Sequence, residues 1–153
     1  MMVYRLIRAK YKEELNGVGA SRYGARWNSP GTELIYTAKS RALAMTELLV
    51  HLDMKEVPAD YFMLSIFIPD KASVQSISES ELSRLWNLNF EYRALTRQVG
   101  DRFIVENKYP LLEVPSAVVK GDFNILINPF HKVFKRIKIV EAVRFPFDKR
   151  FFK

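Results

Sequence analysis

Three side chains that could take part in chemistry follow one another at intervals of ten and eleven residues: Arg26, Tyr36 and Glu47. A guanidinium carries five donors in a fixed fork and can bind a phosphate or a carboxylate through two hydrogen bonds. Arg26 stands beside Trp27, a residue type that anchors loops to a core, and Tyr36 taken alone is most often a core aromatic. The pattern indicates an anion-binding loop that leads into a strand.

Glu47 lies within an expected helix that is capped by Ser40 and runs to about Met54. On a wheel of about 100° per residue, apolar side chains surround almost the whole segment: Leu43, Ala44, Met45, Leu48, Leu49, Val50, Leu52 and Met54. A helix that is apolar all round is buried, and a buried carboxylate is costly unless it is paired. Glu47 is therefore either a structural residue, ion-paired or turned to water, or a catalytic carboxylate at the bottom of a cleft.

These residues require a framework of short strands and a few helices. Strands are expected at Val3–Arg8, Glu33–Ala38, Tyr61–Ile68, Leu111–Val114, Ala117–Val119, Phe123–Ile127 and Arg136–Phe145. Helices are expected at Ser40–Met54, Ser80–Trp86 and Tyr92–Asn107. Lys10–Gly31 is expected to be a long loop with one helical turn at Lys12–Leu15. This mixture is typical of an α+β fold and not of a repeating βαβ array.

Length and composition limit the class of protein. The chain has 153 residues and no cysteine, which predicts one domain over residues 1–153 and excludes disulfide scaffolds and thiolate metal sites. It has no apolar run long enough for a membrane helix and no secretory signal, so we expect a cytoplasmic protein. The two histidines, His51 and His131, cannot form a zinc cluster, and His51 is expected to be a partly buried packing residue.

Several catalytic and nucleotide-binding motifs are absent. Gly17-Val-Gly19 is followed by Arg22, where the dinucleotide fingerprint requires glycine. The chain also lacks a phosphate-binding Gly-Lys-Ser/Thr loop and the Gly-x-Ser-x-Gly elbow of hydrolases. The sequence therefore predicts no recognised nucleotide-binding loop and no serine hydrolase.

The positive charge is concentrated at the C-terminal end. From His131 to Lys153 there are eight basic residues and two acidic ones, which gives +6 of the total +7. Such a segment is either a solvated strand face or a surface that attracts nucleic acid, anionic lipid or an acidic protein. One candidate function is thus a basic nucleic-acid-binding or ribonuclease-type protein, although the chain lacks a histidine pair and an aromatic platform for stacking bases.

The order of motifs resembles one family, the RES-domain toxins of bacterial toxin–antitoxin systems. The resemblance rests on the run from Gly17 to Gly31 that contains Gly-Ala-Arg-Trp-Asn-Ser-Pro-Gly, on Ile35–Ala38, and on Glu47–Leu52. Later segments follow in the same order: Gly100–Phe103, Val114–Val119 and Asn124–His131. Two departures, Ala25 where glycine is frequent and Phe103 where tryptophan is common, should affect packing more than chemistry.

The resemblance implies a fold similar to the ADP-ribosyltransferase toxins, with NAD⁺ as substrate and no metal. It implies catalytic roles for Arg26, Tyr36, Glu47 and Ser116, and substrate binding by Asn28 and Asn128. It also implies an Xre-family helix-turn-helix antitoxin as partner, with DNA contacted through that antitoxin and no membrane involved. The acceptor of the ADP-ribose, whether water, phosphate or a protein, stays open.

The implied chemistry suits these residue types. Cleavage of the nicotinamide–ribose bond resembles glycoside cleavage through an oxocarbenium-like state, which Glu47 would stabilise. Arg26 would bind the diphosphate or the ribose and partner Glu47 at rest, and Tyr36 would stack on the nicotinamide. Ser116 either hydrogen-bonds the substrate or caps the end of a strand. We also expect the basic C-terminal face to contact an acidic region of the antitoxin.

Overall fold

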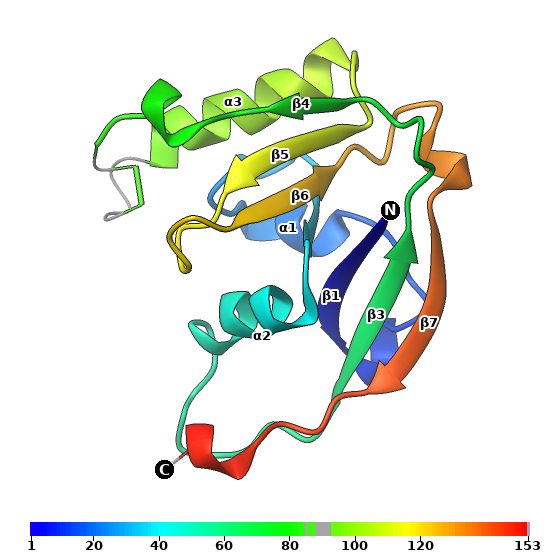
Figure 1. The fold of residues 1–153 in the computed structure, drawn as a ribbon. Helices are drawn as coiled ribbons and strands as arrows, with labels where there is room; N and C mark the ends of the chain where they lie inside the picture. Colours follow the sequence, from blue (N-terminus) through cyan, green and yellow to red (C-terminus); the bar gives the residue numbers. More distant parts are fainter. Residues whose placement is uncertain (85, 88–92, 153) are drawn as a thin grey trace.

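The computed structural model describes residues 1–84, 86–87 and 93–152. Its strands are β1 (Met2–Arg8), β2 (Ile35–Ala38), β3 (Tyr61–Phe67), β4 (Val74–Ser76), β5 (Leu111–Pro115), β6 (Phe123–Ile127) and β7 (Lys138–Arg144). Its α-helices are α1 (Val18–Tyr23), α2 (Arg41–Leu49) and α3 (Arg93–Glu106), and short 3₁₀ turns join several of these elements (Figure 1).

The strands form one sheet in the order β4-β5-β6-β2-β1-β3-β7. β4 and β5 are parallel, and the other neighbouring pairs are antiparallel. β1 pairs with β3 along its whole length but meets β2 at a single pair, Tyr4 with Ala38. The sheet therefore opens between β1 and β2, and Figure 1 shows its two halves turned relative to each other, with α2 beside the opening.

Three apolar clusters hold these elements together. One packs Val3, Ile35, Leu64 and Ile125 across the middle of the sheet. A second lies under α2 and the C-terminal segment and includes Leu43 and Phe147. A third packs α3 and the loop before β2 against the β5–β6 half, with Trp27, Trp86 and Phe103 among its members. The second cluster contains Leu6 of β1 and Ala38 of β2, so it joins the two sides of the opening.

The α+β prediction is confirmed, and most expected strands form within a residue or two of their predicted bounds. The region 10–31 was expected to be a loop, but it contains α1. Asn16 Oδ1 accepts a hydrogen bond from the Val18 N–H at the start of α1, and Gly17 lies so close to Leu34 that an added Cβ would be 2.4 Å from the Leu34 nitrogen. The single turn expected at Lys12–Leu15 forms earlier, at Ala9–Tyr11.

The helix expected at Ser40–Met54 ends at Leu49. Beyond it the Asp53 carboxylate accepts a hydrogen bond from the Lys55 N–H, a local side-chain bond of the kind that competes with helix. Leu52 and Met54, which the helical wheel included, therefore lie beyond the end of the helix. Only Leu43 and Ala44 of α2 are buried, so the expectation of a helix buried on all sides is wrong.

Three further expectations need correction. The strand expected at Ala117–Val119 does not form, because Ser116 Oγ accepts hydrogen bonds from the N–H groups of Val118 and Val119 and turns the chain. The helix expected at Ser80–Trp86 is only a 3₁₀ turn at Glu79–Glu81 among the described residues, residue 85 lying outside them. β4 was not expected, because its Val-Gln-Ser sequence is short and polar.

For the helix expected at Tyr92–Asn107, α3 begins at Arg93, the first described residue of that segment. None of the helices in the described part of the chain has the length and apolar character to cross a membrane.

Candidate active site

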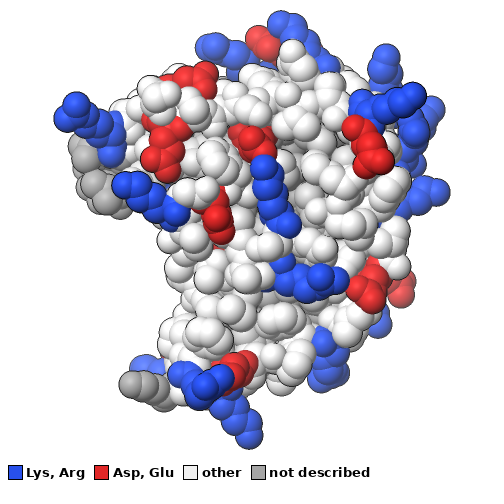
Figure 2. Space-filling view, viewed as in Figure 1, with Lys and Arg blue, Asp and Glu red and all other residues white. Residues whose placement is uncertain are grey.

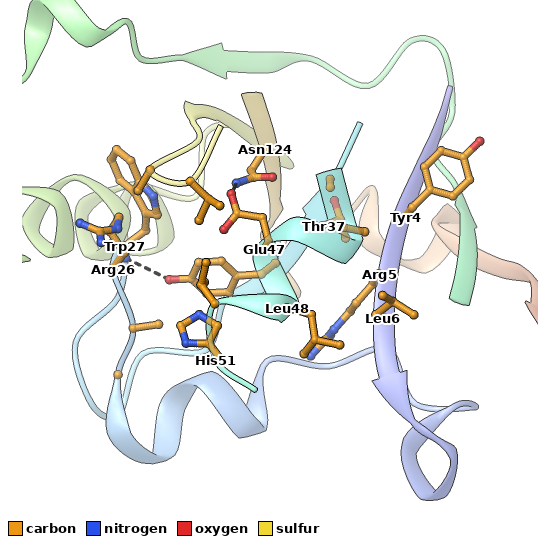
Figure 3. A pocket seen from close by; sticks show the side chains of 18 of the residues that line it. Tyr4, Arg5, Leu6, Arg26, Trp27, Thr37, Glu47, Leu48, His51 and Asn124 are labelled. Carbon is orange, nitrogen blue, oxygen red and sulfur yellow. Dashed lines mark hydrogen bonds between the residues drawn. The ribbon is translucent and has the colours of Figure 1, made fainter. Parts of the chain in front are cut away.

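A pocket of about 400 Å³ lies at the opening between β1 and β2. Tyr4, Arg5 and Leu6 come from β1, Tyr36 to Ala38 from β2, and Glu47 and Leu48 from α2. The loop before β2, the residues just after α2, Arg93 at the start of α3, the turn after β5 and the start of β6 complete its walls. Figure 3 shows the Glu47 carboxylate inside this space, with Arg26 on one side and Arg5 on the other. The pocket thus combines one carboxylate with cationic groups from both halves of the sheet.

Helix α2 presents Glu47 to the pocket. Its start is fixed by Ser40, whose Oγ accepts a hydrogen bond from the Leu43 N–H at 3.1 Å. The Glu47 side chain is half-buried, and its Oε1 accepts hydrogen bonds from Ser116 Oγ and Asn124 Nδ2, both at 2.6 Å. Among the described residues no donor bonds its other oxygen, Oε2. One carboxylate oxygen is therefore anchored and the other is available to a ligand.

Ser116 holds the Glu47 carboxylate in place. Its oxygen accepts hydrogen bonds from the N–H groups of Val118 and Val119 at 3.1 and 2.9 Å, so its own proton is directed to Glu47. Ser116 is 2% exposed and does not line the pocket. The structure therefore shows it in contact with Glu47, and its contact with substrate stays a prediction.

Arg26 lines the pocket from the loop before β2. Its Nη1 donates a hydrogen bond to the Trp86 carbonyl at 2.9 Å, and its guanidinium lies 5.8 Å from the centre of the Trp86 ring. Burial lowers the pKa of Arg26, and Arg93 lowers it further, whereas Glu47 and Tyr36 act in the opposite direction. Within the described chain Arg26 and Glu47 form no direct ion pair, so Arg26 is held by Trp86 at rest rather than by the carboxylate.

Helix α3 holds the Arg26 loop by its backbone. Thr96 Oγ1 donates to the Arg26 carbonyl at 2.5 Å, Arg97 Nε donates to the Ala25 carbonyl, and the Asp101 carboxylate accepts from the Ser29 N–H. The interior Gly100 of this helix contacts the same loop, because an added Cβ would lie 1.6 Å from the Trp27 oxygen. The glycine that weakens the helix is therefore required by a close approach of two backbones.

Tyr36 and Asn28 form a second support. The Tyr36 hydroxyl donates to Asn28 Oδ1 at 2.7 Å and accepts from the Trp27 N–H at 3.0 Å, while the tyrosine side chain lines the pocket. Burial raises the pKa of Tyr36 well above that of a free tyrosine, so the phenol stays protonated and keeps donating. Asn28 is fully buried, and its Nδ2 donates to backbone carbonyls of Ala20, Ser29 and Thr32.

The two asparagines expected to bind substrate do not line the pocket. Asn28 ties the loop to β2, as described above. Asn128 lies past the end of β6, fully buried, where its Nδ2 donates to Asn107 Oδ1 and its Oδ1 accepts from the Phe130 N–H. The structure thus brings Arg26, Tyr36 and Glu47 together, places Ser116 directly behind Glu47, and leaves both asparagines in the supporting structure.

The pocket also contains residues that the sequence analysis did not assign to the site, among them Arg5, Asn124 and His51. Arg5 comes from β1, where burial lowers its pKa and its Nη1 donates to the Asn16 carbonyl at 3.3 Å. A charged residue between Val3 and Ile7, both on the inner side of the strand, is the signal that could have identified it. Asn124 holds Glu47 and begins a motif already noted. His51, expected to be partly buried, is exposed on the pocket wall just after α2.

Comparisons with known proteins identify the family of this chain. A model of the RES domain family matches residues 2–148. The chain is 36% identical over 155 residues to Toxin Res of Photorhabdus laumondii, covering 100% of this chain and 98% of that protein. It is 34% identical over 140 residues to the Prs ADP-ribosylating toxin of Sphingobium, covering 90% and 86%.

A solved structure has a similar fold. A chain in the crystal structure of the MbcT–MbcA toxin–antitoxin complex of M. tuberculosis matches with a TM-score of 0.69, at 19% identity over 95% of this chain and 84% of that one. At this identity the likeness concerns the fold, and it confirms the expected fold class. The match of the family model over nearly the whole chain and the full-length likeness to Toxin Res together show that this chain belongs to the RES domain family.

Proposed function

We propose that this protein is a toxin that consumes NAD⁺ by cleaving the bond between nicotinamide and ribose. The observation that carries the proposal is the Glu47 carboxylate, whose Oε1 is anchored by two hydrogen bonds while its other oxygen faces a pocket. The positive charge that develops on the ribose in the transition state is stabilised by a carboxylate held in place beforehand. The Sphingobium relative is an ADP-ribosylating toxin, which supports this choice of substrate.

The arginines would bind the rest of the substrate. Arg5 and Arg26 approach the pocket from opposite sides (Figure 3), and two guanidiniums match the two negative charges of a diphosphate. In this arrangement the ribose attached to nicotinamide lies over Glu47 Oε2, which accepts a hydrogen bond from a ribose hydroxyl. The Tyr36 ring stacks on the nicotinamide and holds it in the orientation that can be cleaved.

The reaction needs no nucleophile from the protein. As the bond between the ribose carbon and the nicotinamide nitrogen breaks, its electron pair leaves with nicotinamide, which becomes neutral. The positive charge stays on the ribose and is shared with its ring oxygen, close to Glu47. An acceptor oxygen or nitrogen then attacks the ribose carbon and loses a proton, which completes transfer of the ADP-ribose. Glu47, Arg26 and Tyr36 therefore act by orientation and electrostatics.

The test is the substitution Glu47→Gln. Glutamine keeps an oxygen that can accept from Ser116 and Asn124, so the geometry is retained while the negative charge is removed. We expect free nicotinamide to be released at least about a hundredfold more slowly, since one preorganised electrostatic group contributes on this scale. The matched control is Glu106→Gln at the end of α3, where the exposed carboxylate pairs with Lys108 and does not line the pocket.

Wild-type protein that leaves NAD⁺ intact but binds RNA in a salt-dependent manner would refute the proposal and favour the nucleic-acid alternative. A fully active Glu47→Gln protein would refute the role of Glu47. Mass spectrometry of the product assigns the acceptor: free ADP-ribose indicates water, its phosphorylated form indicates phosphate, and a mass increase on a protein indicates transfer to a side chain.

We further propose that a protein antitoxin of the Xre type neutralises the toxin and provides the contact with DNA. Support comes from the structural relative, which was crystallised as a toxin–antitoxin complex. Co-expression with an Xre-type antitoxin encoded beside this protein should restore growth, and the two should elute together in gel filtration. Growth that remains arrested, with no complex formed, would contradict this partner.

A further inference from the structure

The two edges of the sheet differ in length and in cover. One edge is β4, a strand of three residues that lies beside α3 (Figure 1). The other edge is β7, a strand of seven residues of which six are exposed and one is half-buried. Across the described chain, β3 is the only strand that pairs with β7. Natural proteins usually shorten or cover such an edge, because it can pair with another strand.

The register of β3 with β7 shifts between Ser65 and Ile66, so Val140 is an extra residue on β7, and the pairing is regular from Glu141 to Arg144. The Phe145 N–H donates to the Tyr61 carbonyl of β3 at 2.9 Å, one residue beyond the pair of Phe62 with Arg144. Because the hydrogen-bonding direction alternates along an antiparallel strand, the N–H and C=O groups of Ala142 and Arg144 point away from β3. These groups have the positions that an added strand would use.

Apolar side chains lie beside this backbone edge. Val140 and Val143 are 58% and 51% exposed on β7. Phe67, at the end of β3, is 41% exposed and pairs with Lys138. An extended peptide that paired with β7 would cover these side chains, which a purely electrostatic ligand would leave in water.

The charge of this edge is positive where β7 begins. Lys132, Lys135, Arg136 and Lys138 are all exposed, and no acidic residue occurs between His131 and Ile139. The acidic residue of β7 itself, Glu141, already accepts a hydrogen bond from Ser65 and lies 3.7 Å from Arg41. In Figure 2 the Lys and Arg side chains gather at the upper right, beside the turn that precedes β7.

These three features select one kind of partner. A second copy of this chain would bring the same cations to the interface, where like charges repel. A nucleic acid would use the cations but neither the free backbone groups nor the valines. We propose that β7 binds an extended acidic segment of a partner protein, which joins the sheet as an additional strand. This inference does not depend on the NAD⁺ chemistry.

The experiment measures binding of a short fluorescein-labelled peptide that alternates glutamate with valine. In the full-length protein, Ala142→Pro removes one outward N–H but none that faces β3, and we expect it to weaken binding at least tenfold. Lys135→Glu with Lys138→Glu should weaken binding to a similar degree. The matched control, Lys55→Glu with Lys120→Glu, makes the same charge change at exposed lysines elsewhere and should bind like wild type.

Two further probes distinguish strand addition from charge attraction. A peptide of the same sequence, methylated on alternate backbone nitrogens, keeps the charge but cannot form the ladder, and we expect its binding to be lost. Thermal melting reports whether each variant is folded. If Ala142→Pro does not fold, binding of the methylated peptide to the wild-type protein decides whether the peptide adds as a strand. Equal binding of the methylated peptide, or displacement of the acidic peptide by a single-stranded RNA that binds more tightly, would overturn the proposal.

Discussion

At the scale of single residues, the site depends on how one carboxylate is held. Ser116 and Asn124 both donate to Glu47 Oε1, and the Ser116 hydroxyl is itself fixed by two backbone N–H groups. A carboxylate fixed in this way needs little reorganisation when charge develops beside it. Ser116 and Asn124 are therefore positioning residues, which act on the reaction through Glu47.

Ser116→Ala tests this positioning role. The substitution removes one donor from Glu47, and hydrogen bonds to charged groups contribute about 1.5–3 kcal/mol. We expect kcat for nicotinamide release to fall at least about tenfold, while KM changes little because Ser116 does not line the pocket. Steady-state kinetics give both constants. A rise in KM with unchanged kcat would instead show that Ser116 contacts the substrate.

Tyr36→Phe tests the buried phenol by its effect on stability at alkaline pH. Burial raises the pKa of Tyr36 in the folded protein, so above about pH 10 the unfolded chain releases a proton that the folded protein keeps. The free energy of unfolding therefore falls as pH rises through this range, and Tyr36→Phe should reduce that fall. Urea unfolding at neutral and alkaline pH measures this fall in the free energy of unfolding for both proteins.

Tyr23→Phe is the control for this comparison, because the Tyr23 side chain is 83% exposed. It should lose stability at alkaline pH as wild type does. At neutral pH, Tyr36→Phe should also cost about 1 kcal/mol through its lost hydrogen bonds to Asn28 and Trp27. An alkaline profile of Tyr36→Phe identical to wild type would contradict the buried, protonated state.

At the scale of elements, α3 determines where the Arg26 loop lies. Four positions on one side of this helix, Thr96, Arg97, Gly100 and Asp101, contact the backbone of residues 25–29. These contacts hold the loop by its backbone, in addition to the hydrogen bonds of the Asn28 side chain, and so fix where the Arg26 side chain begins. The loop and α3 are distant in sequence, so this support exists only in the folded chain.

Gly100→Ala tests the contact between α3 and the loop. The added methyl would lie 1.6 Å from the Trp27 oxygen, so either the helix or the loop must move. We expect a loss of at least about 2 kcal/mol of stability together with reduced nicotinamide release. In Gly19→Ala, the matched control within α1, the added Cβ meets no atom within 4 Å.

Helix propensity predicts that Gly19→Ala is stabilising by up to about 1 kcal/mol. Thermal melting compares the two variants. If Gly100→Ala were as stable and as active as Gly19→Ala, the close approach between α3 and the loop would not matter for the site.

At the scale of the whole molecule, the pocket exists because the sheet opens. β1 and β2 meet at one pair of residues, and the pocket takes Arg5 from one side of this opening and Tyr36 from the other. A ligand that contacts both sides links the two halves of the sheet. Binding should therefore stabilise the molecule as a whole as well as the residues that touch the ligand.

ADP-ribose is the probe for this linkage, because it keeps the diphosphate and lacks the bond that is cleaved. At a hundredfold excess over Kd it should add about 2.7 kcal/mol to the free energy of unfolding. Hydrogen exchange should slow in both β1 and β2. Arg5→Ala should remove most of the gain, and protection confined to β2 would contradict binding across the opening.

The sequence by itself determined the fold class, most strands and the arginine, tyrosine and glutamate that share the pocket. Such features depend on local alternation of apolar residues and on motifs that are contiguous in the chain. It misjudged the end of α2, the strand expected after Ser116, and α1, since side-chain hydrogen bonds and close approaches decide these points.

Only the tertiary structure decided which residues meet. Arg5 and Asn124 join the pocket from strands far from Glu47 in the sequence, and Asn28 and Asn128 turn inward to bond backbone groups. The helical wheel marked Glu47 as anomalous but could not say what lies opposite it. The physical reason is that a hydrogen bond between distant segments depends on the packing of the whole sheet, so the residues near either partner do not specify which partner it meets.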